Sequence, residues 1–195
     1  VKADTGLVGT TDITITWNKA TVATTEYTYV DLYLDSSKIA DMKAVGTVTF
    51  TVTCGDINHL QIKCHVNQAP TSSDKTVTTN EDTPYTLLLS DFSFTDSDTA
   101  VYGDQLQRVK ITQVETHGSL TLNGSDVILN QEICRSDIVA GNLVFTPDSN
   151  MNGNPYANFK FEVSDGLLYS VSAYTMTIDV TAVNVWSADV GASLT

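Results

Sequence analysis

The stretch "NFKFEVSD", residues 158–165, decides the fold class of this chain. Apolar and polar residues alternate in it, so Phe159, Phe161 and Val163 fall on one side of an extended backbone. This period of two predicts a β-strand with one buried face. Three other stretches share the period: "DITITW" (12–17), "TVTFTVTC" (47–54) and "YTMTIDVTAV" (174–183). The sequence therefore predicts an all-β protein.

Turn signals separate these strands at short intervals. Asn123-Gly124 in "LTLNGSDVIL" can take the positive φ angles that a two-residue hairpin turn needs. Gly166 in "VSDG" predicts another turn. Only residues 36–44 and 131–140 are candidates for helical turns, and both segments are short. Many short strands with frequent turns are typical of β-sandwiches.

The length of 195 residues allows one large domain or two small ones. Pro70 cannot occupy a central strand, so we place a linker at 67–71. Residues 1–66 are predicted to form a small β-sandwich module. Its pattern is similar to an immunoglobulin or fibronectin type III sandwich, but it is short for either, so we expect it to be incomplete or to borrow a strand. Residues 67–184 are predicted to form a second sandwich, and 185–195 a tail or a linker to a further module.

The chain is acidic, with 23 Asp and Glu against 10 Lys and Arg and a formal net charge of -13. A nucleic-acid partner is not expected, because phosphate binding needs clustered Lys and Arg. Membrane insertion is not expected either, because no apolar run approaches the roughly 20 residues of a membrane helix. The excess of acidic over basic residues fits an extracellular surface or a binder of hard cations. Without an initiator Met, we expect a processed chain or a piece of a longer one.

The second module carries an ordered set of motifs. They are "NQAP" (67–70), "NEDTPYTLLLSDFSFTDSD" (80–98), "AGNLVFTPDSNMNG" (140–153), "FKFEVSDG" (159–166) and "VTAVN" (180–184). In this order the set resembles the cadherin-like, immunoglobulin-like tandem repeats of large bacterial surface and adhesin proteins, over about residues 67–184. The resemblance implies tandem immunoglobulin-like β-sandwiches in a non-catalytic, extracellular surface protein.

The stretch "SFTDSDTAVYGDQ", residues 93–105, places Asp96, Asp98 and Asp104 close together in the sequence. Like charges packed this closely repel unless water or a cation stands between them. The stretch is therefore either a solvated loop or part of a Ca²⁺ site.

The resemblance favours the metal and implies a ligand set at one end of the module: Glu81, Asp96, Asp98, Asp165 and Asn184. The linkers depart from the cadherin pattern, because Gln68 follows Asn67 and Val185 follows Asn184 where an acidic residue is usual. Each missing carboxylate removes a ligand, so a Ca²⁺ site and solvated carboxylates both remain open.

The three cysteines leave their pairing open. Cys54 and Cys64 bracket a turn and form either a disulfide or two buried thiols, while Cys134 is expected to be a buried small hydrophobe. The three histidines are scattered without zinc-site spacing, and neither a nucleophile elbow nor a phosphate-binding glycine loop occurs. We expect no enzyme activity.

The sequence thus predicts a structural or adhesive segment of a cell-surface protein, built as a rod that Ca²⁺ would stiffen if the site binds it, whose partners are neighbouring modules or further copies. One alternative is a self-assembling filament subunit, with 1–10 or 185–195 completing a neighbour's sheet. Another is a module that binds surface glycans or a host protein, for which a cluster of Tyr27, Tyr29 and Tyr33 would be the candidate surface. Trp17 is expected to be a core residue.

Overall fold

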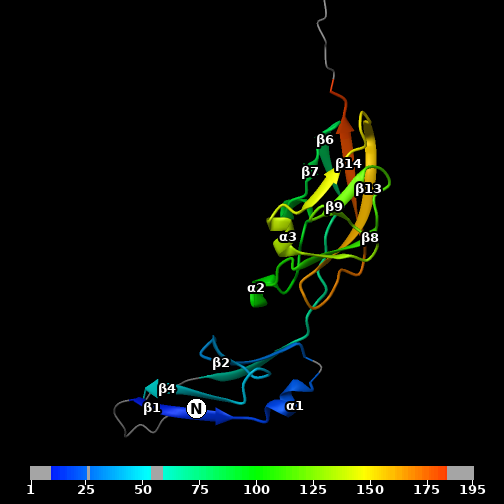
Figure 1. Ribbon diagram of the computed structural model, residues 1–195. Coiled ribbons are helices and arrows are strands. Elements are labelled where there is room, and N and C mark those ends of the chain that lie inside the picture. Colours follow the sequence, from blue (N-terminus) through cyan, green and yellow to red (C-terminus); the bar gives the residue numbers. More distant parts are fainter. Residues whose placement is uncertain (1–9, 26, 54–58, 184–195) are drawn as a thin grey trace, which may run out of the picture. The chain divides into compact units, whose positions relative to one another are not determined.

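The computed structural model describes residues 10–25, 27–53 and 59–183. The chain divides into two compact units, Val1–Asn67 and Gln68–Thr195, and the division falls within the predicted linker at 67–71. Figure 1 shows strands as the main element in both units. Among the described residues, each helix is too short or too polar to cross a membrane.

The described residues of unit 1 form two small antiparallel sheets and one short helix. The first sheet pairs β1 (Thr10–Thr16) with β4 (Thr47–Thr53), and the second has the order β3 (Ser37–Asp41), β2 (Tyr29–Leu34), β5 (Leu60–His65). The helix α1 (Lys19–Ala23) follows β1. The core of unit 1 contains Val30, Leu32, Ala40 and Met42. Trp17 packs against this core and its Nε1 donates to the carbonyl oxygen of Met42 at 2.9 Å, as a core residue should.

The segment 36–44 is a strand over Ser37–Asp41, and a turn follows in which the amides of Ala44 and Val45 both donate to the carbonyl oxygen of Asp41 at 3.1 Å. Asp35 and Ser36 both have positive φ, at 48° and 74°, and they form the tight turn between β2 and β3. This turn brings Ser37 opposite Leu34 and sets the strand pairing. Local propensity could not reveal it, because the cross-strand partner decides the conformation.

Unit 2 is a sandwich of two sheets. The larger has the order β11 (Glu132–Cys134), β8 (Arg108–Gln113), β13 (Gly153–Ser164), β14 (Tyr174–Thr181), β6 (Lys75–Asn80). The smaller has the order β10 (Ser125–Asp126), β9 (Ser119–Leu122), β12 (Leu143–Thr146), β7 (Tyr85–Thr86). Its short helices are η1 (Leu89–Asp91), α2 (Thr99–Tyr102) and α3 (Arg135–Val139). The all-β sandwich predicted from the alternation is confirmed.

The core of unit 2 fills the space between the two sheets. Phe159, Phe161 and Val163 of β13 are fully buried, as the alternation predicted. They meet core residues of the smaller sheet such as Leu120 and Phe145. The predicted hairpin is also confirmed, since Asn123 and Gly124 have φ of 52° and 76° and join β9 to β10.

Cys134 is exposed, so the expectation that it is a buried hydrophobe is wrong. Its neighbour Ile133 on β11 is fully buried instead. Successive side chains of a strand point to opposite faces, and Ile133 occupies the core-facing position.

The longest strand, β13, defines two ends of unit 2. At one end Ser164 pairs with Arg108 of β8, and at the other Gly153 pairs with Val180 of β14. We call these the Ser164 end and the Gly153 end. A strand of 12 residues separates its termini by roughly 35 Å at about 3.3 Å per residue, so side chains at opposite ends cannot share a ligand.

Replacing Phe161 with Ala is expected to destabilise unit 2 by about 3–5 kcal/mol, because it leaves a cavity in the core. The Phe161 ring is fully buried and meets Phe92 edge-on at 5.0 Å between centroids. Val171→Ala is the control, since Val171 is 93% exposed in the loop after β13 and its loss should cost less than about 0.5 kcal/mol. Urea unfolding followed by circular dichroism measures both, and equal losses would contradict this packing.

Candidate metal centre

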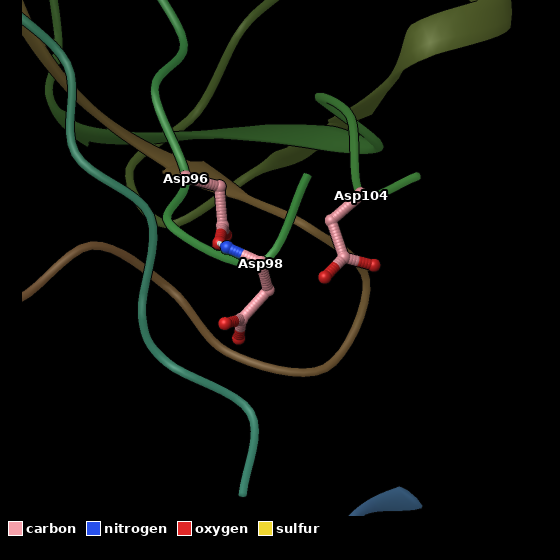
Figure 2. Close-up of side chains that lie close together, drawn as sticks. All are labelled: Asp96, Asp98 and Asp104. Carbon is pink, nitrogen blue, oxygen red and sulfur yellow. Dashed lines mark hydrogen bonds between the residues drawn. The ribbon is translucent and has the colours of Figure 1, made fainter. Parts of the chain in front are cut away.

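Three aspartates at the Ser164 end of unit 2 bring their carboxylates together. One oxygen each of Asp96, Asp98 and Asp104 lies within 4.8 Å of the other two. Figure 2 shows the Asp96 carboxylate beside the backbone nitrogen of Asp98, with the Asp104 carboxylate turned toward the same region. Three negative charges this close repel strongly unless a cation or water stands between them.

The short helix α2 places Asp98 and Asp104 side by side. Asp98 is its N-cap residue, and Gly103 ends the turn with a φ of 75° in the left-handed region. The Thr99 hydroxyl donates to the carbonyl oxygen of Asp104 at 2.9 Å, so Asp104, which follows the helix, is held against the first residue of the helix. The helical turn therefore acts as a connector that brings two aspartates from its two ends to one place.

Burial makes this cluster different from an ordinary acidic loop. Asp98 is 3% exposed and Asp96 is 9% exposed. The Asp98 amide donates to Asp96 Oδ1 at 2.8 Å, but Asp96 Oδ2 is buried and accepts no hydrogen bond from any described residue. A buried carboxylate oxygen without a donor is costly. A hard cation with oxygen ligands, such as Ca²⁺, fits this donor set.

The cluster is tied to the start of unit 2. The Gln68 amide donates to Asp98 Oδ2 at 2.7 Å. Next to it, Thr71 and Thr95 exchange two backbone hydrogen bonds of 2.8 and 2.9 Å. The backbone that enters unit 2 is therefore held directly against the segment that carries the aspartates.

Of the other predicted ligands, Asp165 lies at the Ser164 end but outside the group of three. Its Oδ1 accepts hydrogen bonds from the amides of Leu167 and Leu168, at 2.6 and 2.8 Å, and so shapes the turn after β13. Asn184 lies outside the described residues.

Glu81 does not join Asp96 and Asp98, contrary to the expected convergence at one end of the module. It follows β6 at the Gly153 end, where its Oε1 accepts from the Val183 amide at 2.8 Å. The strand pairing explains this, because β6 runs parallel to β14 and Asn80 pairs with Thr181. Asp104 completes the cluster instead. The closely spaced aspartates of 93–105 had pointed to Asp104, but Asp104 was not among the predicted ligands.

A second polar cluster lies at the Gly153 end. A pocket of about 180 Å³ is lined by His117, Asp148, Tyr156 and four residues of the segment 151–155. The Tyr156 hydroxyl donates to Asp148 Oδ2 at 2.8 Å, and this bond, with a further one from the Gly118 amide, lowers the pKa of Asp148. Burial of the phenol is the main cause that raises the pKa of Tyr156. None of these residues was a predicted ligand: Asp148 lies in the motif at 140–153, and His117 is one of the three scattered histidines.

The remaining candidate residues lie on unit 1. Tyr29 stacks with His65 at 6.3 Å between centroids, and the Lys63 ammonium lies 4.0 Å from the ring centre of Tyr33. Tyr27 is exposed. Cys64 is exposed on β5 rather than buried, and Cys54 lies outside the described residues, so their disulfide stays a prediction.

The two facing sheets of unit 2, with their shared core and mainly antiparallel pairing, define an immunoglobulin-like β-sandwich. The sequence matches the family described as bacterial Ig domain over residues 67–181, and the chain belongs to this family. The match confirms the expected immunoglobulin-like repeat of bacterial surface proteins, and the family is one of non-catalytic domains. No curated protein matches the chain.

Tyr156→Phe should raise the pKa of Asp148 toward its ordinary value, because it removes the hydrogen bond that lowers it most. In the wild type the lowered pKa means that ionised Asp148 adds stability above its ordinary pKa, and this stability is lost as the pH falls through the lowered value. NMR titration of the carboxyl carbon measures the change. Tyr174→Phe is the control, and an unchanged Asp148 pKa in Tyr156→Phe would mean that the Gly118 amide dominates.

Proposed function

We propose that this chain is a structural segment of a bacterial cell-surface protein, exposed outside the cell, in which the Ig module binds Ca²⁺ through Asp96, Asp98 and Asp104. The observation that carries the proposal is the cluster of three carboxylates, two of them on buried residues and the third half-buried, with an Asp96 oxygen that no described residue satisfies. Ca²⁺ takes six to eight oxygen ligands, so water and backbone carbonyls would complete its shell.

The proposed role of the ion is mechanical. Asp98 holds the Gln68 amide, and Gln68 is the first residue of unit 2. An ion that fixes Asp98 would therefore also restrict the backbone at the point where the chain enters the module. In a tandem array, a less flexible connection between modules gives a stiffer rod.

Thermal unfolding of the full chain, in excess Ca²⁺ and in chelator, tests the site. A ligand at 100 times its dissociation constant that binds only the folded state adds about 2.7 kcal/mol, which is an increase of several degrees in Tm. We expect this increase in the wild type and its loss when Asp96 and Asp98 are both changed to Asn. Asp104→Asn should weaken it, since it removes one of the three charges.

Glu81→Gln is the matched control, because it removes one carboxylate from the opposite end of the same module. Its Ca²⁺ response should equal that of the wild type. A wild type without any Ca²⁺ response would leave the aspartates as solvated or internally satisfied groups. If Ca²⁺ still raises Tm after Asp96 and Asp98 are both changed to Asn, the ion binds at another site.

A second candidate function is ligand binding, favoured by the pocket at the Gly153 end. The Tyr156 ring, the His117 imidazole and the carboxylate of Asp148 combine an aromatic surface with fixed polar groups. This combination suits a sugar ring of a surface glycan. Saturation-transfer NMR with a panel of methyl glycosides tests it: signals that vanish in Asp148→Ala support the site, and their absence from the whole panel contradicts it.

A further inference from the structure

Strand β4 has a sequence that reads the same in both directions. Residues Thr47–Thr53 are Thr-Val-Thr-Phe-Thr-Val-Thr, with Phe50 at the centre. Every Thr is exposed, while Val48 and Phe50 are half-buried and Val52 is buried. A palindromic strand is self-complementary in antiparallel pairing, because a two-fold axis through its central residue places identical side chains opposite one another.

One edge of β4 has no strand partner among the described residues. Its other edge pairs with β1 in an unbroken register of seven residues, from Thr10 opposite Thr53 to Thr16 opposite Thr47. The Thr faces of the two strands already match, since the hydroxyls of Thr14 and Thr49 share a hydrogen bond of 2.7 Å. Figure 1 shows β1 and β4 lying side by side as a separate ribbon.

The other edges of the described sheets carry features that discourage pairing. The strands β7, β10 and β11 have only two or three residues. Lys38 of β3, Lys63 of β5 and Lys75 of β6 put a positive charge on each of those strands, and Asp12 puts a negative charge on β1. Among the described strands at a sheet edge, β4 alone combines a length of seven residues with the absence of charge, proline and bulge.

We propose that β4 is a homotypic docking edge, which pairs antiparallel with β4 of a second copy of this chain. The two-fold axis passes through Phe50, so Phe50 lies beside its counterpart, Thr49 lies opposite Thr51 of the second copy, and Thr47 lies opposite Thr53 of the second copy. The two β1–β4 pairs then form one four-stranded sheet with the order β1-β4-β4-β1. The second copy is the occupant that the palindrome favours, because among the described strands no other matches β4 in composition at every position.

Charge and burial are consistent with this pairing. The net charge of -13 on each chain opposes self-association, but β4 itself carries no charged residue, and the carboxylate of Asp12 on β1 accepts a hydrogen bond from the Thr51 hydroxyl. Phe50 is half-buried within its own unit, and a second Phe50 would cover its remaining apolar surface. A two-fold contact of this kind closes on itself and gives a dimer rather than an open filament.

Sedimentation velocity of the full chain, over a wide concentration range in reductant and at physiological ionic strength, which screens the repulsion between the two acidic chains, tests the dimer. We expect reversible dimerisation of the wild type. The double variant T49K/T51K places Lys opposite Lys across the axis and should weaken the dimer by about tenfold or more. The variant T49E/T51K places Glu opposite Lys in the same register and should retain the dimer. T14K/T16K, which adds the same charge on β1, is the control and should also retain it.

A second measurement does not depend on these charge changes. With the three native cysteines changed to Ser, Phe50→Cys should give a disulfide-linked dimer on mild oxidation, because residues at the two-fold axis of an antiparallel pair lie within disulfide distance. Ile13→Cys, on the same face of β1, should not. The proposal is overturned if the wild type stays monomeric at every concentration, if T49K/T51K and T49E/T51K dimerise equally, or if Phe50→Cys fails to cross-link while folded. Because the edge lies in unit 1, none of these outcomes depends on the Ca²⁺ site of unit 2.

Discussion

The burial of one face of β13 is the constraint on which unit 2 depends. Phe159, Phe161 and Val163 are removed from water together, and they require an apolar surface opposite them. The smaller sheet supplies that surface. Because β13 also pairs with both β8 and β14, it sets the register of the larger sheet. The aspartate cluster lies in the segment before β8, and the pocket lies beside the start of β13, so both candidate sites adjoin strands that the core holds in place.

Local sequence was enough to predict the features that residues close together in the chain determine. The alternation in 158–165 predicted the buried face, Asn123-Gly124 predicted a hairpin, and the crowding of aspartates in 93–105 pointed to the segment that carries the cluster. In each case the relevant groups lie within a few residues of one another, so backbone geometry alone brings them together. The resemblance to bacterial surface repeats added the family, which the match over 67–181 confirms.

Pairing between distant strands accounts for what the sequence could not predict. Glu81 and Asp96 were expected together, but the parallel pairing of β6 with β14 carries Glu81 to the far end of the module. The segment 36–44 was a candidate for helical turns, but its first part, Ser37–Asp41, is a strand that pairs with β2 after the turn at Asp35-Ser36. Which face of β11 is buried also decides the exposure of Cys134. A single sequence contains no direct signal for which distant strands pair or which face of a strand is buried.

The parallel pairing of β6 and β14 has a consequence for a chain under tension. β6 lies near the start of unit 2 and β14 near its end, and six residue pairs, from Lys75–Met176 to Asn80–Thr181, join them. Pulling the module apart by its two ends would drag β6 and β14 in opposite directions along their own axes. The hydrogen bonds between them would then be loaded in shear, all at once, and would not open one after another like a zipper. Such a geometry resists extension more strongly than a hairpin peeled from its open end.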